Sequence, residues 1–265
     1  MNHIKELLGV LLMMLHNNCF QDSFLLENNI VISVKDEQKC VDEGMFEYIE
    51  HIGAFYKYNL LCSHEVLINR FPNVLHYLDC FWLILPKLII ERRIFWKEFY
   101  NLYSNIYDKL VDSDHNINCI CHFKNILEKR KLYSPNSLIF DFGCGIGLSS
   151  HVFDNKHLFG YDSNALMEAK AEKCGLKIIS RNQFQNIAED SFDICIACYV
   201  FHLSIDEYEI VKLTNIIKRG GAIIANFYKG IEEERINQII SNCDLKIERV
   251  EYLNGKYGSI YVYRK

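Results

Sequence analysis

Carboxylates and glycines in the second half of the chain are the residues whose spacing could bind a ligand. Asp141 ends a short apolar run, residues 138–140, and Gly143, Gly145 and Gly147 follow it at once. Such a run is typical of a buried parallel strand, and glycines allow a tight turn that brings the main chain close to a ligand. A helix directly after the glycines would point its free N–H groups at the same ligand.

The spacing of these glycines narrows the class of ligand. Leu148 stands where the dinucleotide-binding fingerprint has its third glycine, and no Lys-Ser or Lys-Thr pair follows as in a phosphate-binding loop. Asp141 would also repel a phosphate and attract a cation. The pattern therefore disfavours pyrophosphate, including NAD in an oxidoreductase, and favours a positively charged ligand.

Residues 141–147, Asp-Phe-Gly-Cys-Gly-Ile-Gly, resemble the first motif of the class I S-adenosylmethionine (SAM)-dependent methyltransferases, whose ligand carries an ammonium and a sulfonium. The resemblance continues in order through the second half of the chain, with an acid at Asp162 and the double glycine at 220–221 before the fifth strand. It implies an α/β fold with a Rossmann-like sheet, mostly parallel and closed by an antiparallel hairpin. It also implies SAM as the cofactor and S-adenosylhomocysteine (SAH) as its product.

The resemblance further implies which residues hold the cofactor. Asp162 would bind both ribose hydroxyls. Asn182 stands where the family commonly has an acid that binds the adenine amino group, and its amide oxygen could accept the same hydrogen bond. The cofactor-binding residues expected on these grounds are Asp141, Phe142, Gly143, Gly145, Asp162, Ser163, Asn182, Cys198 and Tyr199.

Two residues are candidates for catalysis. His202 follows the fourth predicted strand, residues 191–198, and the usual pKa of imidazole suits proton removal near neutral pH. It could be the base, or it could pack against a lid. Tyr107, like Tyr103, could border the donor or the acceptor, although the helical spacing of the two tyrosines equally suits core packing.

Apolar periodicity divides the chain into two domains. Helical spacing in residues 1–19, 42–58 and 74–90 predicts a mainly helical N-terminal domain, residues 1–130, that serves as a lid, a substrate-binding part or a dimerisation element. Residues 131–265 are expected to form the SAM-binding core. A homodimer through the N-terminal helices is one possible assembly.

Composition excludes several classes of protein. A net charge of −5 argues against a broad nucleic-acid surface. The apolar residues 74–90 contain His76, Asp79 and Lys87, so they predict a buried helical hairpin and no membrane span. The 11 cysteines in 265 residues are not spaced as a secreted disulfide framework and indicate a reducing, cytoplasmic location.

The cysteine clusters do not predict a metal site. Cys195 and Cys198 lie three apart in a predicted strand, so their side chains should point to opposite faces of the sheet. Cys119, Cys121 and His122 lack a matching second pair of ligands.

These features together predict methyl transfer from SAM to a small organic acceptor with an oxygen, nitrogen or carbon nucleophile. The acceptor is expected to be small because the motifs of nucleic-acid and protein-arginine methyltransferases are absent from the sequence. The alternative is a catalytically silent SAM-binding scaffold or regulatory protein. Both share the cofactor site, and only a methylated product distinguishes them.

Overall fold

The computed structural model describes residues 31–33, 46–48, 55–58, 74–77, 81–85, 88–104, 107–252 and 255–265. Its contacts divide the chain into two compact units, Met1–Glu98 and Phe99–Lys265. The helix predicted over residues 1–19 lies outside the described residues.

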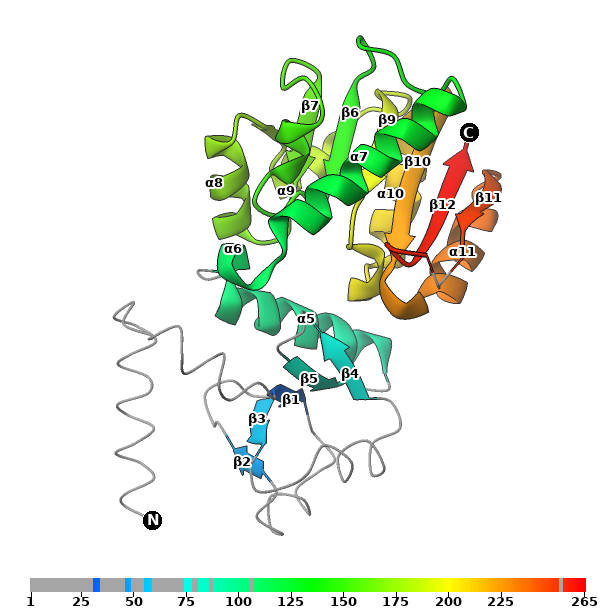
Figure 1. Ribbon diagram of the computed structural model, residues 1–265. Helices are drawn as coiled ribbons and strands as arrows, with labels where there is room; N and C mark the ends of the chain where they lie inside the picture. The colour runs from blue at the N-terminus through cyan, green and yellow to red at the C-terminus, as the bar shows by residue number, and fades with distance from the viewer. Residues whose placement is uncertain are drawn as a thin grey trace. The chain divides into compact units, whose positions relative to one another are not determined.

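The first unit, where described, contains five short strands and the start of one helix (Figure 1). The strands β1, β3 and β2 form an antiparallel sheet in that order, and β4 pairs with β5 as an antiparallel hairpin. The elements are β1 Val31–Ser33, β2 Phe46–Tyr48, β3 Phe55–Tyr58, β4 Val74–Tyr77, β5 Phe81–Ile84 and α5 Ile89–Tyr103, the last of which continues into the second unit.

The prediction of helices over residues 42–58 and 74–90 was therefore wrong at residues 46–48, 55–58, 74–77 and 81–84, which form strands, whereas residues 89–90 are helical. Both segments hold strands rich in aromatic residues, such as Phe55–Tyr58 and Phe81–Ile84. Aromatic side chains favour strands, and short apolar runs fit a helical or a strand period equally well. Among the described residues, no helix is long and apolar enough to cross a membrane.

A seven-stranded sheet lies at the centre of the second unit, in the order β11-β12-β10-β9-β6-β7-β8. The five strands from β8 to β10 run parallel to their neighbours, whereas β12 is antiparallel to both β10 and β11. The mostly parallel sheet and its antiparallel hairpin are thus confirmed. The strands are β6 Ile139–Phe142, β7 Leu158–Tyr161, β8 Lys177–Ile178, β9 Phe192–Ala197, β10 Ile217–Phe227, β11 Lys246–Glu251 and β12 Ser259–Arg264.

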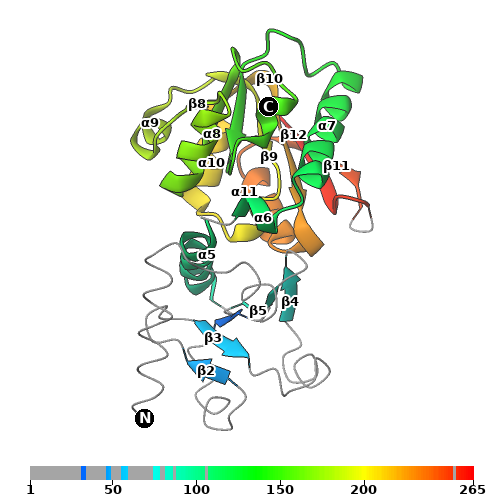
Figure 2. The same cartoon turned by 60° about the vertical axis from the view of Figure 1, so that its left-hand side comes forward.

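Helices cover both faces of this sheet (Figures 1 and 2). The helix α7 crosses one face, and α10 and α11 pack on the other. The helices of this unit after α5 are α6 Tyr107–Leu110, α7 Ser113–Lys129, α8 Ala165–Lys173, α9 Arg181–Asn186, α10 Glu207–Ile216 and α11 Glu233–Ser241, with 3-10 turns η2 Leu148–His151, η3 Phe201–Leu203 and η4 Tyr228–Gly230.

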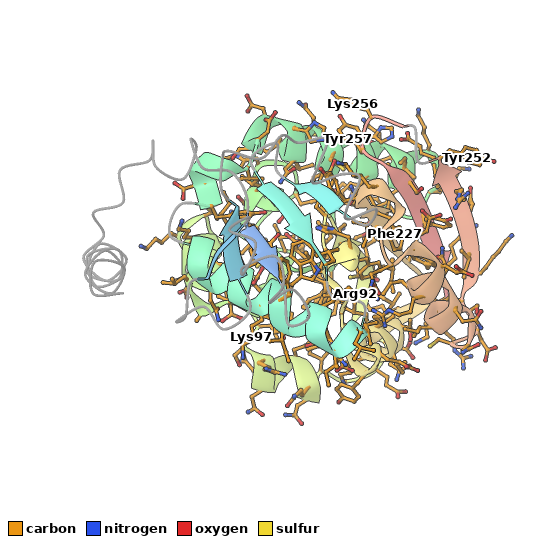
Figure 3. The ribbon with its side chains drawn as sticks, turned by 90° about the horizontal axis from the view of Figure 1, so that it is seen from below. Arg92, Lys97, Phe227, Tyr252, Lys256 and Tyr257 are labelled. Atoms are coloured by element: carbon orange, nitrogen blue, oxygen red, sulfur yellow. The ribbon has the colours of Figure 1, made fainter. Side chains whose placement is uncertain are left out.

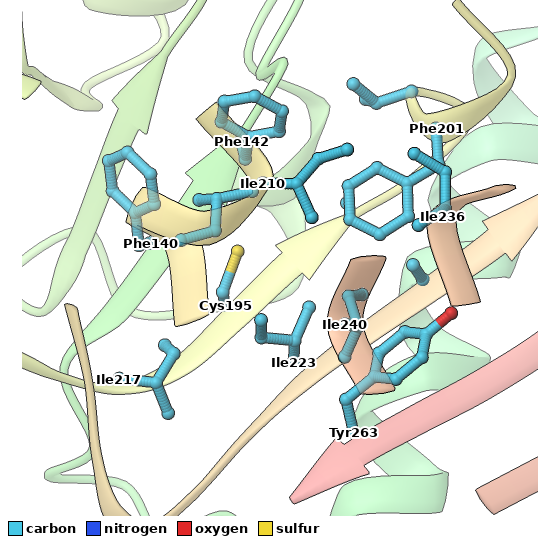
Figure 4. Packing of buried hydrophobic residues seen from close by; sticks show 14 of the residues in the cluster. Phe140, Phe142, Cys195, Phe201, Ile210, Ile217, Ile223, Ile236, Ile240 and Tyr263 are labelled. Carbon is cyan, nitrogen blue, oxygen red and sulfur yellow. The ribbon is translucent and has the colours of Figure 1, made fainter. Parts of the chain in front are cut away.

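Side chains that alternate between the two faces of the central strands form two hydrophobic cores, one on each side of the sheet. In β9, Ile194 and Ile196 pack with α7, whereas Cys195 and Ala197 face α10 and α11 (Figure 4). Cys198 packs on the α7 side, so it and Cys195 do point to opposite faces, as a strand period of two requires. Every central strand is buried on both sides, which accounts for its nearly continuous apolar sequence.

The first contact-defined unit ends at Glu98, well before the domain boundary predicted at residue 130. The reason lies in α7, whose buried side chains include Cys119, Phe123 and Leu127. They share one core with Ile139 and other residues of the sheet. The helix that precedes the first parallel strand is therefore part of the α/β core.

Asp193 joins three segments near the starts of β6 and β9. Its carboxylate accepts the backbone N–H of Leu138 at 2.7 Å and the Lys218 ammonium at 2.9 Å. These contacts give Asp193 a structural role.

We expect Asp193→Ala to lower the free energy of unfolding by roughly 1–3 kcal/mol, because it leaves the Leu138 N–H without its acceptor. Asp193→Asn keeps an acceptor oxygen and loses only a partly exposed ion pair, so it should cost less than the alanine change. Urea unfolding of both variants measures the difference. An alanine variant as stable as the wild type would contradict this role.

Candidate functional site

The glycine-rich turn leaves β6 with positive φ angles of 73° at Gly143, 53° at Gly145 and 83° at Gly147. A Cβ on Gly143 would lie 2.5 Å from the Cγ2 atom of Val200, so packing within the protein requires that glycine. Among the described residues, a Cβ on Gly145 would have only the Tyr107 ring as a neighbour, at 4.0 Å. The main chain at Gly145 is therefore the part of the turn that a ligand can approach.

The segment after the glycines forms one 3-10 turn, η2, and no longer helix, contrary to the prediction of a helix starting at Leu148. Hydroxyl groups explain the difference. Ser149 donates to Asp141, and Ser150 donates to the carbonyl of Gly147 at 2.7 Å. Such local bonds compete with helical ones, so the turn ends after one cycle.

Asp141 is buried at the end of β6, with 4% of its surface exposed. Its carboxylate accepts the hydroxyl of Ser149 at 2.5 Å. Burial is the largest cause of a pKa raised to about 7, the Ser149 hydrogen bond opposes that rise, and the negative charge of Asp162 adds to it. A positive ligand beside Asp141 would therefore favour its ionised form.

Asp162 follows β7 on the neighbouring strand, and its carboxylate faces the same turn. It accepts the backbone N–H of Gly145 and that of Asn164, each at 2.9 Å. Burial raises its pKa to about 6, these N–H groups oppose the rise, and the charge of Glu168 adds to it. The carboxyl ends of two adjacent parallel strands therefore carry acids that repel each other, and one of these acids, Asp162, binds the glycine-rich turn at Gly145.

Tyr107 lies beside this acidic pair. Its ring is the neighbour of Gly145, and the pKa of its phenol is raised mainly by burial and also by the negative charge of Asp162. The ring also packs against Tyr100 at a centroid distance of 5.7 Å. Tyr107 is thus brought to the predicted cofactor site, where it borders the turn as a neutral phenol.

Tyr199 has the left-handed φ of 56°, which is uncommon for a bulky side chain. The amide oxygen of Asn226 accepts the Tyr199 backbone N–H at 2.7 Å, and the Asn226 side-chain nitrogen donates to the carbonyl of Tyr257 at 2.9 Å. The Tyr199 hydroxyl lies 2.8 Å from Nε2 of His115, which comes from α7. Burial raises the pKa of the Tyr199 phenol.

Two predicted cofactor residues contribute less than expected through their side chains. Phe142 is 2% exposed and stacks on Tyr161 at 5.7 Å, so its ring belongs to the core. Ser163 is exposed, and its backbone N–H is one of the groups that lower the pKa of Asp162. The main chain of both residues can still border a ligand.

Asn182 lies in the first turn of α9, exposed, and its side-chain oxygen accepts the amide of Asn186 at 3.3 Å. Cys198 lies close enough to Tyr107 and Asp141 to interact with both electrostatically. Burial raises the pKa of the Cys198 thiol, and the charge of Asp141 adds to this rise. The structure therefore brings Cys198 to the acidic turn, whereas the adenine contact of Asn182 stays a prediction.

His202 is fully buried in η3, and its ring packs against Tyr228 at 5.6 Å. Burial lowers its pKa to about 3, so the imidazole is neutral and a weak base. This environment favours the packing interpretation of His202 over the catalytic one.

Sequence reasoning missed His115 and Asn226. Asn226 has a visible signal, because it is one polar residue at the carboxyl end of the apolar run 222–225. His115 has none, since its partner Tyr199 lies 84 positions away in the sequence. Among the described residues, no group of three or more His, Cys, Asp or Glu side chains could hold a metal ion.

The mostly parallel seven-stranded sheet and the glycine-rich turn beside two acids are the features that the sequence resemblance to class I SAM-dependent methyltransferases implied. A scan against known protein families finds no match, and no curated protein matches the sequence. Solved structures of such enzymes resemble the chain at low identity. A TehB-like SAM-dependent methyltransferase from Corynebacterium glutamicum shares 13% identity, with 64% of this chain and 98% of the other covered and a TM-score of 0.45.

Two further solved structures are similar in the same way. A SAM-dependent methyltransferase of Thermotoga maritima, described as a possible histamine N-methyltransferase, shares 15% identity over 63% of this chain and 100% of its own, with a TM-score of 0.42. The CurJ carbon methyltransferase shares 12% over 85% of this chain and 77% of its own, with a TM-score of 0.46.

The raised pKa values of Asp141 and Asp162 predict a pH-dependent stability. A folded pKa above the unfolded value stabilises the fold most below the unfolded pKa, and this stabilisation is lost as pH rises through the folded pKa. Without ligand, stability should therefore fall between about pH 4 and pH 7.

Asp141→Asn, which stays neutral, should show a smaller fall in melting temperature from pH 5 to pH 7.5 than the wild type does. Asp114→Asn, at an exposed position in the first turn of α7, is the matched control and should behave as the wild type. Thermal melts at both pH values test this, and an equal fall in all three proteins would contradict the assigned burial of Asp141.

Proposed function

We propose that this protein transfers the methyl group of SAM to a small organic acceptor with an oxygen, nitrogen or carbon nucleophile. The observation that supports it is the pair Asp141 and Asp162, a buried and a partly buried acid beside the glycine-rich turn, of which Asp162 binds the Gly145 N–H. The charged neighbours that raise the pKa of each acid are themselves acids. A cationic ligand would remove this repulsion, and SAM carries two positive groups.

The residues present fit SAM on their own chemistry. A carboxylate has about four acceptor sites, so Asp162 can bind ribose hydroxyls while it keeps the N–H groups of Gly145 and Asn164. Asp141 would attract the ammonium of the methionine part. A Cβ at position 145 would begin to fill the space beside Tyr107, which supports a ligand lying against the main chain there.

SAM supplies an activated methyl group, so the protein's main task is alignment. Orientation of two reactants can contribute about 7–11 kcal/mol to lowering the barrier. Tyr199 and Cys198 follow β9, next to the strand that carries Asp141, on the side of the sheet where open α/β folds bind ligands. They would border the path of the acceptor.

A catalytically silent SAM-binding protein is the second candidate. It is favoured by the complete burial and lowered pKa of His202, which make the base predicted from the sequence ineffective. Release of SAH together with a methylated product separates the two candidates.

Asp162→Ala should weaken SAM binding at least about tenfold, since hydrogen bonds to a charged group are worth roughly 1.5–3 kcal/mol each. Calorimetry with SAM and SAH measures the affinity, and NADH serves as the negative ligand. Asp190→Ala is the control, because Asp190 pairs with Lys265 at the chain end. An Asp162→Ala protein that is folded and binds SAM as the wild type does would remove this site assignment.

The N-terminal residues are proposed to govern the choice of acceptor, as a lid or substrate-binding part. A protein that begins at Phe99 keeps the contact-defined second unit. It should bind SAM but lose activity or selectivity, measured as SAH released with and without acceptor. Full activity of this shortened protein, in soluble form, would exclude the lid role and leave a dimerisation element.

A further inference from the structure

Six aromatic rings form an unbroken series around the carboxyl ends of β9 and β10. Neighbouring rings are 5.2 to 6.5 Å apart between centroids, and they come from α7, the turn after β9, η3, η4 and the segment before β12, where Tyr257 lies (Figure 3). In order along the series, the rings are His122, Tyr257, His115, Tyr199, Tyr228 and His202.

Tyr199 and His115 are the polar centre of this series. The Tyr199 hydroxyl and the His115 Nε2 atom are 2.8 Å apart, and both side chains keep part of their surface exposed. His202, at the end of the series, is fully buried. The pair of Tyr199 and His115 can therefore exchange a proton with solvent, whereas the buried His202 cannot.

The strain at Tyr199 indicates that its placement matters. A tyrosine with φ of 56° persists only when neighbouring contacts hold it, and Asn226 provides such a contact through the 2.7 Å bond to its backbone. Asn226 is itself fully buried and bonded at both ends of its amide. Its position is thus independent of any ligand.

We propose that the acceptor is an aromatic molecule with a hydroxyl group, and that Tyr199 is the catalytic residue that receives its proton and passes its own proton to His115, while Asn226 positions Tyr199. The proposal rests on the methyl-transfer function above. Aromatic rings bind well against other rings, so the series favours an aromatic acceptor, and the hydrogen-bonded pair of Tyr199 and His115 in it matches a hydroxyl.

The chemical step balances as follows. The acceptor oxygen bonds to the methyl carbon while the carbon–sulfur bond breaks, and its electron pair stays on sulfur to give the neutral thioether SAH. The acceptor's proton moves to the Tyr199 oxygen as the tyrosine's own proton moves to Nε2 of His115, in the tautomer whose hydrogen is on Nδ1. His115 then releases that proton to solvent.

The test begins with the wild-type, full-length protein, SAM and a panel of phenols and catechols, beside aliphatic alcohols, amines and carboxylates. Product is detected by mass as the acceptor plus one methyl group. Methylation of a phenol or catechol is expected. Binding of SAM without any aryl ether product would overturn this inference and leave the proposed function standing, whereas absence of SAM binding would overturn both.

Tyr199→Phe should then lower kcat about 10²–10⁴-fold with little change in the affinity for SAM, because the ring stays and only the hydroxyl is lost. Tyr208→Phe, at an exposed tyrosine of α10, is the matched control and should keep full activity. A Tyr199→Phe protein that keeps more than about a tenth of the wild-type kcat would overturn the assignment.

His115 is tested by a pair of variants. His115→Gln can accept the tyrosine's hydrogen bond but cannot take its proton, so kcat should fall while KM changes little. His115→Gly should regain activity when free imidazole is added, a result that a purely structural role would not produce. Activity of the glutamine variant equal to wild type, or no rescue of the glycine variant by imidazole, would contradict the role of His115.

Discussion

The bond between the Gly145 N–H and the Asp162 carboxylate is the interaction on which the candidate site depends. It joins the turn after β6 to the residue after β7, so that the ends of these two adjacent strands are held together. It also keeps Asp162 in place although burial favours the neutral acid. The candidate site is therefore formed before any ligand binds. The acids in it repel one another, and a bound cation can relieve this repulsion.

The sequence could predict the α/β core because its signals are local. An apolar run, three glycines and acids after successive strands occur within short windows, and the same windows became β6, its turn and β7. The opposite orientation of Cys195 and Cys198 also follows from a strand period of two. Wherever one element determines the role of a residue, the sequence was sufficient.

Other features depend on contacts between distant segments. The strands β3 and β5 resembled helices, because short aromatic runs fit either period and pairing with another strand decides between them. The burial that makes His202 a weak base comes from the fold around η3, and the partnership of His115 with Tyr199 joins α7 to the end of β9. No local pattern contains such information.

The two hydrogen bonds of the Asn226 amide connect positions 199, 226 and 257. Its oxygen accepts the backbone N–H of Tyr199, where the left-handed conformation is one that only glycine adopts freely. Its nitrogen donates to the carbonyl of Tyr257. Aspartate would lose the donor, and glutamine would displace both contacts by one methylene. In related sequences, a change at position 226 should therefore accompany glycine at position 199, because a glycine there adopts the left-handed conformation without the hydrogen bond from its N–H to the Asn226 side chain.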